Sequence, residues 1–216
     1  MTDNSPGPKI LVRGAGEMAT GIAYHLHING CRVCLTEIAS PLAVSRANAF
    51  SDAVFDGTKI VCDVTAMRIQ PSIREIEDTW SQGNIPLVID TAIIKEQLHP
   101  DVVVDATMTK IGTSTKITDA SLVIGIGPGF DAGKNVHIVI ETNDSKGDAG
   151  KLIFKGEAEK NTNIPMETGG VRNERVIWAA LSACHLSIFS PSNISLCSFG
   201  VKPCRQGVKY SQVLSR

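Results

Sequence analysis

The sequence lacks several features that would point to particular classes of protein. No uninterrupted apolar run reaches the roughly 18–20 residues that a membrane span requires, and the first residues, MTDNSPGPK, lack the apolar region of a secretory signal. Neither sign of charge is in excess, since 21 Lys and Arg balance 22 Asp and Glu, so a polyanion-binding surface is not indicated. These absences predict a cytoplasmic protein with neither membrane nor nucleic-acid partners.

The six cysteines lack the arrangement of a metal centre. Cys31 and Cys34 have the C-x-x-C spacing, but no second such pair and no cluster of histidines supports them. They lie in CRVCLTE, a run typical of a strand, where residues three apart face opposite sides of the sheet. We therefore interpret both as small core residues of a reduced protein, although redox or zinc chemistry is the alternative. No metal ion is expected.

The hydrophobic pattern predicts an α/β fold. Residues 9–37 indicate strand, glycine turn, helix and strand, which is a βαβ unit. A second helix is expected over residues 41–55, PLAVSRANAFSDAVF, and one strand over residues 58–69, TKIVCDVTAMRI. A polar helix ending at Gly83, then strand, short helix and strand up to Thr107, complete the expected Rossmann-like parallel sheet.

The second half of the chain changes character and suggests three parts. We expect a Rossmann-like nucleotide-binding domain over 8–120 and a small segment with a glycine-rich loop and β-rich runs over 121–175. Residues 176–216 keep no regular period, contain no Asp or Glu, and hold half of the cysteines. This tail is expected to be irregular or poorly ordered, because scattered apolar residues do not offset the entropy of ordering the backbone.

The strongest motif is Gly14-Ala15-Gly16-Glu17-Met18-Ala19, which matches the dinucleotide fingerprint G-x-G-x-x-A. It follows a strand and opens a helix, and Glu37 ends the next strand about twenty residues on, where an acid binds ribose hydroxyls. Glutamate there would repel a 2′-phosphate, which favours NAD-like over NADP-like ligands. The residues predicted to bind the cofactor here are Gly14, Ala15, Gly16, Glu17, Met18, Ala19 and Glu37.

Two departures leave a purely structural turn as the alternative. Glu17 places a negative charge at the helix N-terminus, where a phosphate would compete with it. Arg13 precedes the turn in place of an apolar residue.

Other candidates lie at the ends of later strands. Gly127 and Gly129 belong to a second glycine-rich loop, GIGPGFDAG, which fits an anion-binding nest or a rigid connection equally well. Asp90 and Asp105 end parallel strands at the edge where open α/β sheets bind ligands, so Asp90 joins the cofactor-binding candidates; either residue could instead cap a helix. His137 is more simply a structural histidine than a catalytic one.

Several long blocks together resemble the YqeB family, whose members are associated with selenium-dependent molybdenum hydroxylase systems. The resemblance covers roughly residues 8–176. It is carried by ILVRGAGEMATGIAYHLHINGCRVCLTEI, AFSDAVFDG, DVVVDATMTK, LVIGIGPGFDAGKNVHIVIETN and GEAEKNTNIPMETGG. It implies a Rossmann-like domain and an accessory or maturation role for a molybdenum enzyme, but no established reaction, so catalytic residues stay unknown.

Family members continue into a β-rich segment that resembles a biotinyl or lipoyl carrier fold. This chain has NERVIWAALSACHLSIF at that point, which suggests a truncated or frameshifted reading frame after about residue 176, or a divergent tail.

Three functional hypotheses follow. The first is an accessory protein of molybdenum hydroxylase maturation that binds a nucleotide, NAD-like or molybdopterin-linked, and has the hydroxylase or its maturation machinery as partner. The second is an NAD-dependent oxidoreductase, although Asp90, Asp105 and His137 form no recognisable proton-transfer group in sequence. The third is a non-catalytic Rossmann-like binding module.

Overall fold

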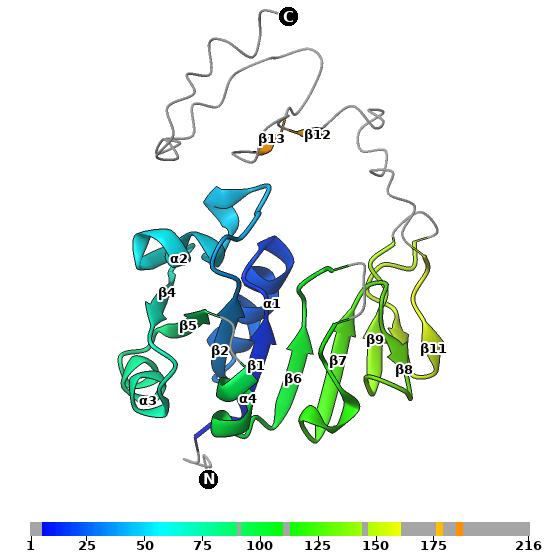
Figure 1. The fold of residues 1–216 in the computed structure, drawn as a ribbon, viewed down its shortest axis with the longest axis horizontal. Helices are drawn as coiled ribbons and strands as arrows, with labels where there is room; N and C mark the ends of the chain where they lie inside the picture. Colours follow the sequence, from blue (N-terminus) through cyan, green and yellow to red (C-terminus); the bar gives the residue numbers. More distant parts are fainter. Residues whose placement is uncertain are drawn as a thin grey trace, which may run out of the picture. The chain divides into compact units, whose positions relative to one another are not determined.

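The computed structural model describes residues 6–89, 92–109, 113–143, 147–160, 176–178 and 185–187. The chain divides into two compact units, residues 1–166 and 167–216. In the first unit the described residues form a nine-stranded sheet of order β10-β9-β7-β6-β1-β2-β5-β4-β3 (Figure 1). In the second unit β12 (Val176–Trp178) pairs antiparallel with β13 (His185–Ser187).

The strands of the large sheet are β1 (Lys9–Arg13), β2 (Arg32–Glu37), β3 (Thr58–Val61), β4 (Val64–Ile69), β5 (Ile85–Ile89), β6 (Val102–Asp105), β7 (Leu122–Ile126), β9 (Ile138–Ile140) and β10 (Leu152–Ile153). The helices are α1 (Glu17–Ile28), α2 (Ala53–Asp56), α3 (Ile73–Ser81) and α4 (Ala92–Leu98), with 3₁₀ turns η1 (Arg46–Asn48), η2 (Phe50–Asp52) and η3 (Ile117–Asp119). β8 (Asp131–Ala132) and β11 (Gly156–Glu157) make a small antiparallel sheet.

The sheet has the topology expected of a Rossmann-like fold. β1 pairs in parallel with β2 on one side and with β6 on the other. Strands β2 to β5 all lie on one side of β1, in the spatial order β2-β5-β4-β3, and the chain then crosses to β6 and β7 on the other side, so the strand order reverses at β1. Open α/β sheets bind ligands at such a reversal, at the carboxyl ends of the strands. The ends of β1 and β6 are therefore the expected place of a ligand site.

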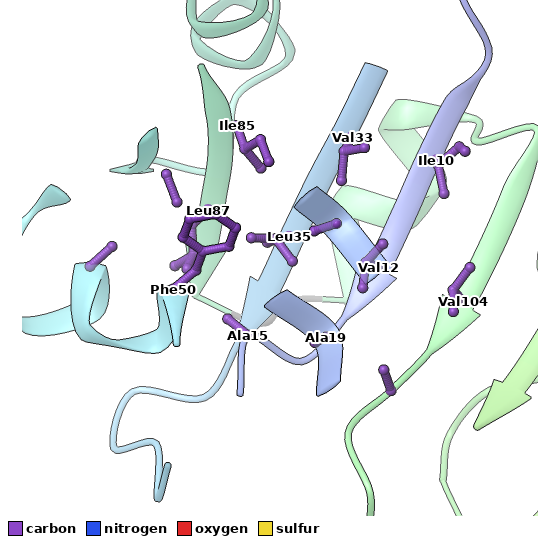
Figure 2. Close-up of a cluster of buried hydrophobic side chains, with 14 of the residues drawn as sticks. Ile10, Val12, Ala15, Ala19, Val33, Leu35, Phe50, Ile85, Leu87 and Val104 are labelled. Carbon is purple, nitrogen blue, oxygen red and sulfur yellow. The ribbon is translucent and has the colours of Figure 1, made fainter. Parts of the chain in front are cut away.

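Helices cover both faces of the sheet, because the side chains of each parallel strand alternate between two cores. Ile10 and Val12 pack with Ala19 of α1 in one cluster (Figure 2). Leu11 of the same strand packs in a second cluster, which also contains Ile94 of α4. The α/β fold class predicted from the sequence is confirmed.

The predicted second helix, residues 41–55, is wrong. The segment instead forms η1, η2 and the short helix α2. Three of its backbone N–H groups bond the glycine loop and the start of α1. Ser45 N–H donates to Glu17 Oε1, and Phe50 N–H donates to Thr20 Oγ1 at 2.9 Å. Ser51 N–H donates to the Ala15 carbonyl at 2.8 Å. Donors used in this way cannot form the i→i−4 bonds of a continuous helix.

The predicted single strand over residues 58–69 is also wrong, because it is a hairpin of β3 and β4. Cys62 takes a left-handed conformation with φ 55° and turns the chain, and Val61 pairs directly with Val64. Ile60 of β3 is 63% exposed at the sheet edge. Alternation alone cannot separate a long strand from a tight hairpin.

The large sheet continues across residue 120, where the sequence suggested a change of domain. β7 pairs in parallel with β6, and β9 and β10 extend the same sheet. The compact unit ends at residue 166. Apart from β12 and β13, the expected irregular tail lies outside the described residues.

Candidate functional site

Gly14, the first glycine of the fingerprint, is required by the fold. Its φ of +96° is unfavourable for residues with a side chain, and a Cβ there would lie 3.0 Å from the Ala106 carbonyl oxygen after β6. Its N–H donates to the Thr36 carbonyl at 2.8 Å. Gly14 therefore makes the turn that brings the ends of β1, β2 and β6 together.

Gly16, the second glycine, has no such structural reason. Its φ of −67° and ψ of −173° suit any residue, and a Cβ there would meet nothing within 4 Å. It precedes helix α1, whose N-terminus has no side-chain cap. The open space beside Gly16 and the uncapped amides of the first turn fit the close approach of a phosphate.

The third small residue packs the helix onto the sheet, as the fingerprint requires. Ala19 is completely buried in the cluster that contains Val12. Met18, its neighbour, is 44% exposed.

Glu37 lies against the glycine loop. Its Oε2 accepts the Ala15 N–H at 2.7 Å, and its Oε1 accepts the Ile38 N–H at 2.7 Å. The acid at the end of β2 is thus placed beside the loop, as the motif predicts. Each carboxylate oxygen can accept more than one hydrogen bond, so contact with the loop and with a ribose hydroxyl are compatible.

Glu17 does not turn its carboxylate into the glycine loop. Its Oε1 accepts the N–H of Ser45, which holds the segment before η1 against the first turn of α1. The carboxylate thus has a structural contact with the Ser45 segment, and its negative charge remains beside the first turn of α1.

A buried polar network lies on the other side of β1 and was missed as a group by sequence reasoning. Asp105 is completely buried, and its Oδ2 accepts from Arg13 Nη1 at 3.1 Å and from Thr115 Oγ1 at 2.5 Å. Its Oδ1 accepts from Thr107 Oγ1 at 2.6 Å. The available signal was an arginine where the fingerprint has an apolar residue, followed by an aspartate that ends a parallel strand.

The second glycine loop reaches the same strand edge. A Cβ on Gly127 would lie 2.8 Å from Thr142 Oγ1 and 3.6 Å from the Met108 side chain, and one on Gly129 would lie 3.3 Å from the Thr109 carbonyl oxygen. Both glycines have positive φ, +77° and +105°. These contacts give both glycines a structural role; their predicted part in ligand binding stays a prediction.

The histidine and cysteine candidates have structural roles. His137 Nδ1 accepts the Val123 N–H at 3.0 Å, which ties the start of β9 to β7 and gives the histidine a structural function. Asp90 lies outside the described residues.

Cys34 is fully buried in one core, and Cys31 packs against the other. Burial raises the pKa of the Cys34 thiol to about 12. This agrees with their interpretation as core residues.

The described part of the chain holds neither a metal-binding cluster nor a membrane-spanning helix. No group of three or more His, Cys, Asp or Glu residues there is arranged to hold a metal ion. No helix in those residues is long and apolar enough to cross a membrane.

Comparison with known proteins places these observations in a family. No protein-family model matches the chain, and no solved structure matches it. The chain is 39% identical over 171 residues to the uncharacterized protein YqeB of Escherichia coli (strain K12). The alignment covers 79% of this chain and 31% of the relative, so the chain spans about a third of the relative's length. This identity extends over most of a chain that carries the fingerprint on a parallel sheet. It shows that the chain belongs to the YqeB family.

Proposed function

We propose that the chain binds a nucleotide, or the nucleotide part of a molybdopterin cofactor, where β1 ends and α1 begins. The observation that carries the proposal is Gly16, whose lack of a side chain is explained by neither backbone conformation nor packing. Close approach of a phosphate to the backbone is a physical reason for glycine at this position.

The residues around Gly16 have defined parts in this proposal. The N–H groups of the first turn of α1, at Glu17 and Met18, receive the phosphate, aided by the helix dipole. Glu37 accepts hydrogen bonds from the ribose hydroxyls while it also accepts the Ala15 N–H. Its negative charge disfavours a 2′-phosphate, so NAD-like ligands are favoured over NADP-like ones. Asp90, Gly127 and Gly129 remain proposed contacts to the far part of the ligand.

The proposed role is that of an accessory protein in the maturation of a molybdenum hydroxylase. This part of the proposal is supported by family membership and by the association of that family with selenium-dependent molybdenum hydroxylase systems. The partner would be the hydroxylase or its maturation machinery. The proposed location is the cytoplasm, where free thiols such as those of Cys31, Cys34 and Cys62 are kept reduced.

An NAD-dependent oxidoreductase is less well supported by the described geometry. A hydride transfer that makes or breaks a hydroxyl group needs a residue that exchanges a proton beside the nicotinamide. Asp105 is buried and paired with Arg13, while His137 is bonded to Val123 at the far end of β7. Neither residue is presented to a ligand at the glycine loop.

The experiment is calorimetric titration with NAD, ATP, CTP and a molybdopterin nucleotide, using wild type, Gly16→Ala and Gly21→Ala. Gly21 is the matched control, because it also has open space around its missing Cβ but lies further along α1. We expect Gly16→Ala to fold normally and to bind at least about tenfold more weakly, the effect of losing about 1.4 kcal/mol. Gly21→Ala should bind as wild type and be more stable by about 0.5–1 kcal/mol.

Two results would contradict the proposal. One is a wild-type Kd above about 1 mM for all four nucleotides, which corresponds to less than about 4 kcal/mol of binding free energy. The other is equal affinity of Gly16→Ala and wild type. Mass spectrometry of small molecules that copurify with the protein would then show whether another ligand occupies the loop.

A further inference from the structure

Arg13 is a charged residue at the last position of a buried strand. Its side chain is only 15% exposed, and it pairs with Asp105, whose side chain is completely buried. Among the residues that the guanidinium contacts, Nη1 is 3.1 Å from Asp105 Oδ2 and also bonds Thr115 Oγ1, and Nη2 is 3.1 Å from Ser114 Oγ. A planar guanidinium can hold several acceptors in fixed directions, which an ammonium group cannot do.

The network faces away from the N-terminus of α1. Side chains alternate along β1, and Val12 lies in the cluster beneath α1, whereas Leu11 lies in the cluster beneath α4. Arg13 therefore projects to the same side as Leu11, where it meets Asp105. Helix α1, whose first amides are proposed to bind phosphate, packs on the opposite face of the sheet, and the guanidinium bonds Asp105, Thr115 and Ser114.

The network fixes the backbone on both sides of the glycine turn. Arg13 is joined to Gly14 by a peptide bond, and its carbonyl accepts the Ala106 N–H at 2.9 Å. Asp105 precedes Ala106, whose carbonyl lies against Gly14, and also accepts the Thr107 hydroxyl. Movement of either charged side chain would shift the end of β1 relative to the end of β6.

From this geometry we propose that Arg13 is a positioning residue that sets nucleotide affinity through Asp105, by holding the glycine loop at a fixed place between β1 and β6. The inference rests on the proposed nucleotide binding, and it adds the residue pair that determines how well the loop amides are aligned. It also explains why an arginine stands where the dinucleotide fingerprint has an apolar residue.

The test is a double-mutant cycle on affinity. Arg13→Met, Asp105→Asn and the double variant are titrated with whichever of NAD, ATP, CTP and the molybdopterin nucleotide binds wild type most tightly. If Arg13 acts through Asp105, each single variant binds about tenfold more weakly and the double variant is no weaker than the singles. Arg32→Met is the control. Arg32 donates to the Gly7 carbonyl at the start of β2, at the amino ends of the parallel strands and away from the glycine loop, so its loss should leave affinity unchanged.

A milder variant covers the case in which the single variants do not fold, because one buried charge is left without its partner. Thr115→Val removes only the hydroxyl that bridges Arg13 and Asp105 and keeps the side-chain shape. We expect it to fold and to bind about threefold more weakly, within the range seen for residues that modulate a site they do not touch.

The outcomes separate the two proposals. Suppose that wild type binds nucleotide and that the fold-losses in affinity of Arg13→Met and Asp105→Asn multiply in the double variant. The two residues would then act independently, and this inference alone would be overturned. Wild-type affinity in folded Arg13→Met or in Thr115→Val would also overturn it. Absence of nucleotide binding by wild type would overturn the proposed function and this inference together.

Discussion

Glu37 has a structural bond to the glycine loop in addition to its proposed contact with ribose. Its two carboxylate oxygens accept the N–H groups of Ala15 and Ile38, each at 2.7 Å. Hydrogen bonds to a charged acceptor contribute more than neutral ones. A residue that served the ligand alone would change affinity without changing the stability of the protein, so the two roles can be measured separately.

We expect Glu37→Ala to lower the free energy of unfolding without ligand by about 1–3 kcal/mol, because two backbone donors lose a charged acceptor. Urea unfolding followed by circular dichroism measures this. Glu75→Ala is the matched control, since Glu75 also accepts one backbone N–H, from Gln70, but at an exposed site; its loss should cost less than about 1 kcal/mol. Equal stability of Glu37→Ala and wild type would leave the acid with a ligand role only.

The cysteines differ in reactivity because they differ in burial. The pKa of the Cys34 thiol is raised to about 12 by desolvation in the core, and the reactive form of cysteine is the thiolate. At pH 8–9 Cys34 therefore remains a thiol in the folded protein, while Cys62 is exposed at the β3–β4 turn.

We expect iodoacetamide to alkylate Cys62 in the native protein and to reach Cys34 only after denaturation. Peptide mapping by mass spectrometry distinguishes these two residues from each other and from the remaining cysteines. Labelling of Cys34 at the rate of Cys62 under native conditions would show that β2 opens readily. It would also remove the reason for treating Cys34 as a core residue.

At the scale of single residues, the sequence could predict the fingerprint and Glu37, because their spacing follows from one strand–turn–helix–strand unit. It could not predict the pairing of Arg13 with Asp105. These residues are 92 positions apart, and they meet only because β6 returns to lie beside β1. Nothing local in either segment specifies that neighbour.

At the scale of elements, the βαβ unit was predictable because hydrophobic period and glycine positions agree along its whole length. The segment 41–55 was not, although its apolar residues have helical spacing. Thr20 explains part of the difference: its hydroxyl accepts the Phe50 N–H at 2.9 Å and donates to the Ala15 carbonyl at 3.2 Å. A tertiary contact thus overrides the local pattern.

Thr20→Val should therefore destabilise the protein by about 1–3 kcal/mol, because the buried Phe50 N–H loses its acceptor. Thr20→Ser keeps the hydroxyl and serves as the control, with a smaller loss from the missing methyl group, about 1 kcal/mol. Thermal unfolding of both variants provides the comparison. If Thr20→Val were as stable as Thr20→Ser, the hydroxyl would not be what holds η2 against α1.

At the scale of the whole molecule, the sheet is continuous through the point where the sequence changes character. The glycine-rich and β-rich composition after residue 120 suggested a separate segment, but β7 lies between β6 and β9 in one sheet. Composition describes a segment's own residues and carries no information about which strand it will pair with. The second core crosses the same point, since Val123, Phe130, Val136 and Val139 pack with Leu11 and Val103.

A fragment of residues 1–120 should therefore fail to unfold cooperatively, while a fragment of residues 1–166 should do so. The shorter fragment leaves β6 as a sheet edge and removes, among other buried side chains, those of Val123, Phe130, Val136 and Val139. Each contributes about 1.5–3 kcal/mol when buried, so their sum is comparable to the roughly 5–15 kcal/mol that stabilises a whole domain. Denaturant unfolding with fluorescence and circular dichroism measures cooperativity, and the two signals should change together only for the longer fragment. Coincident, cooperative unfolding of residues 1–120 would mean that β1 to β6 form an independent nucleotide-binding domain and that the later strands are an addition to it.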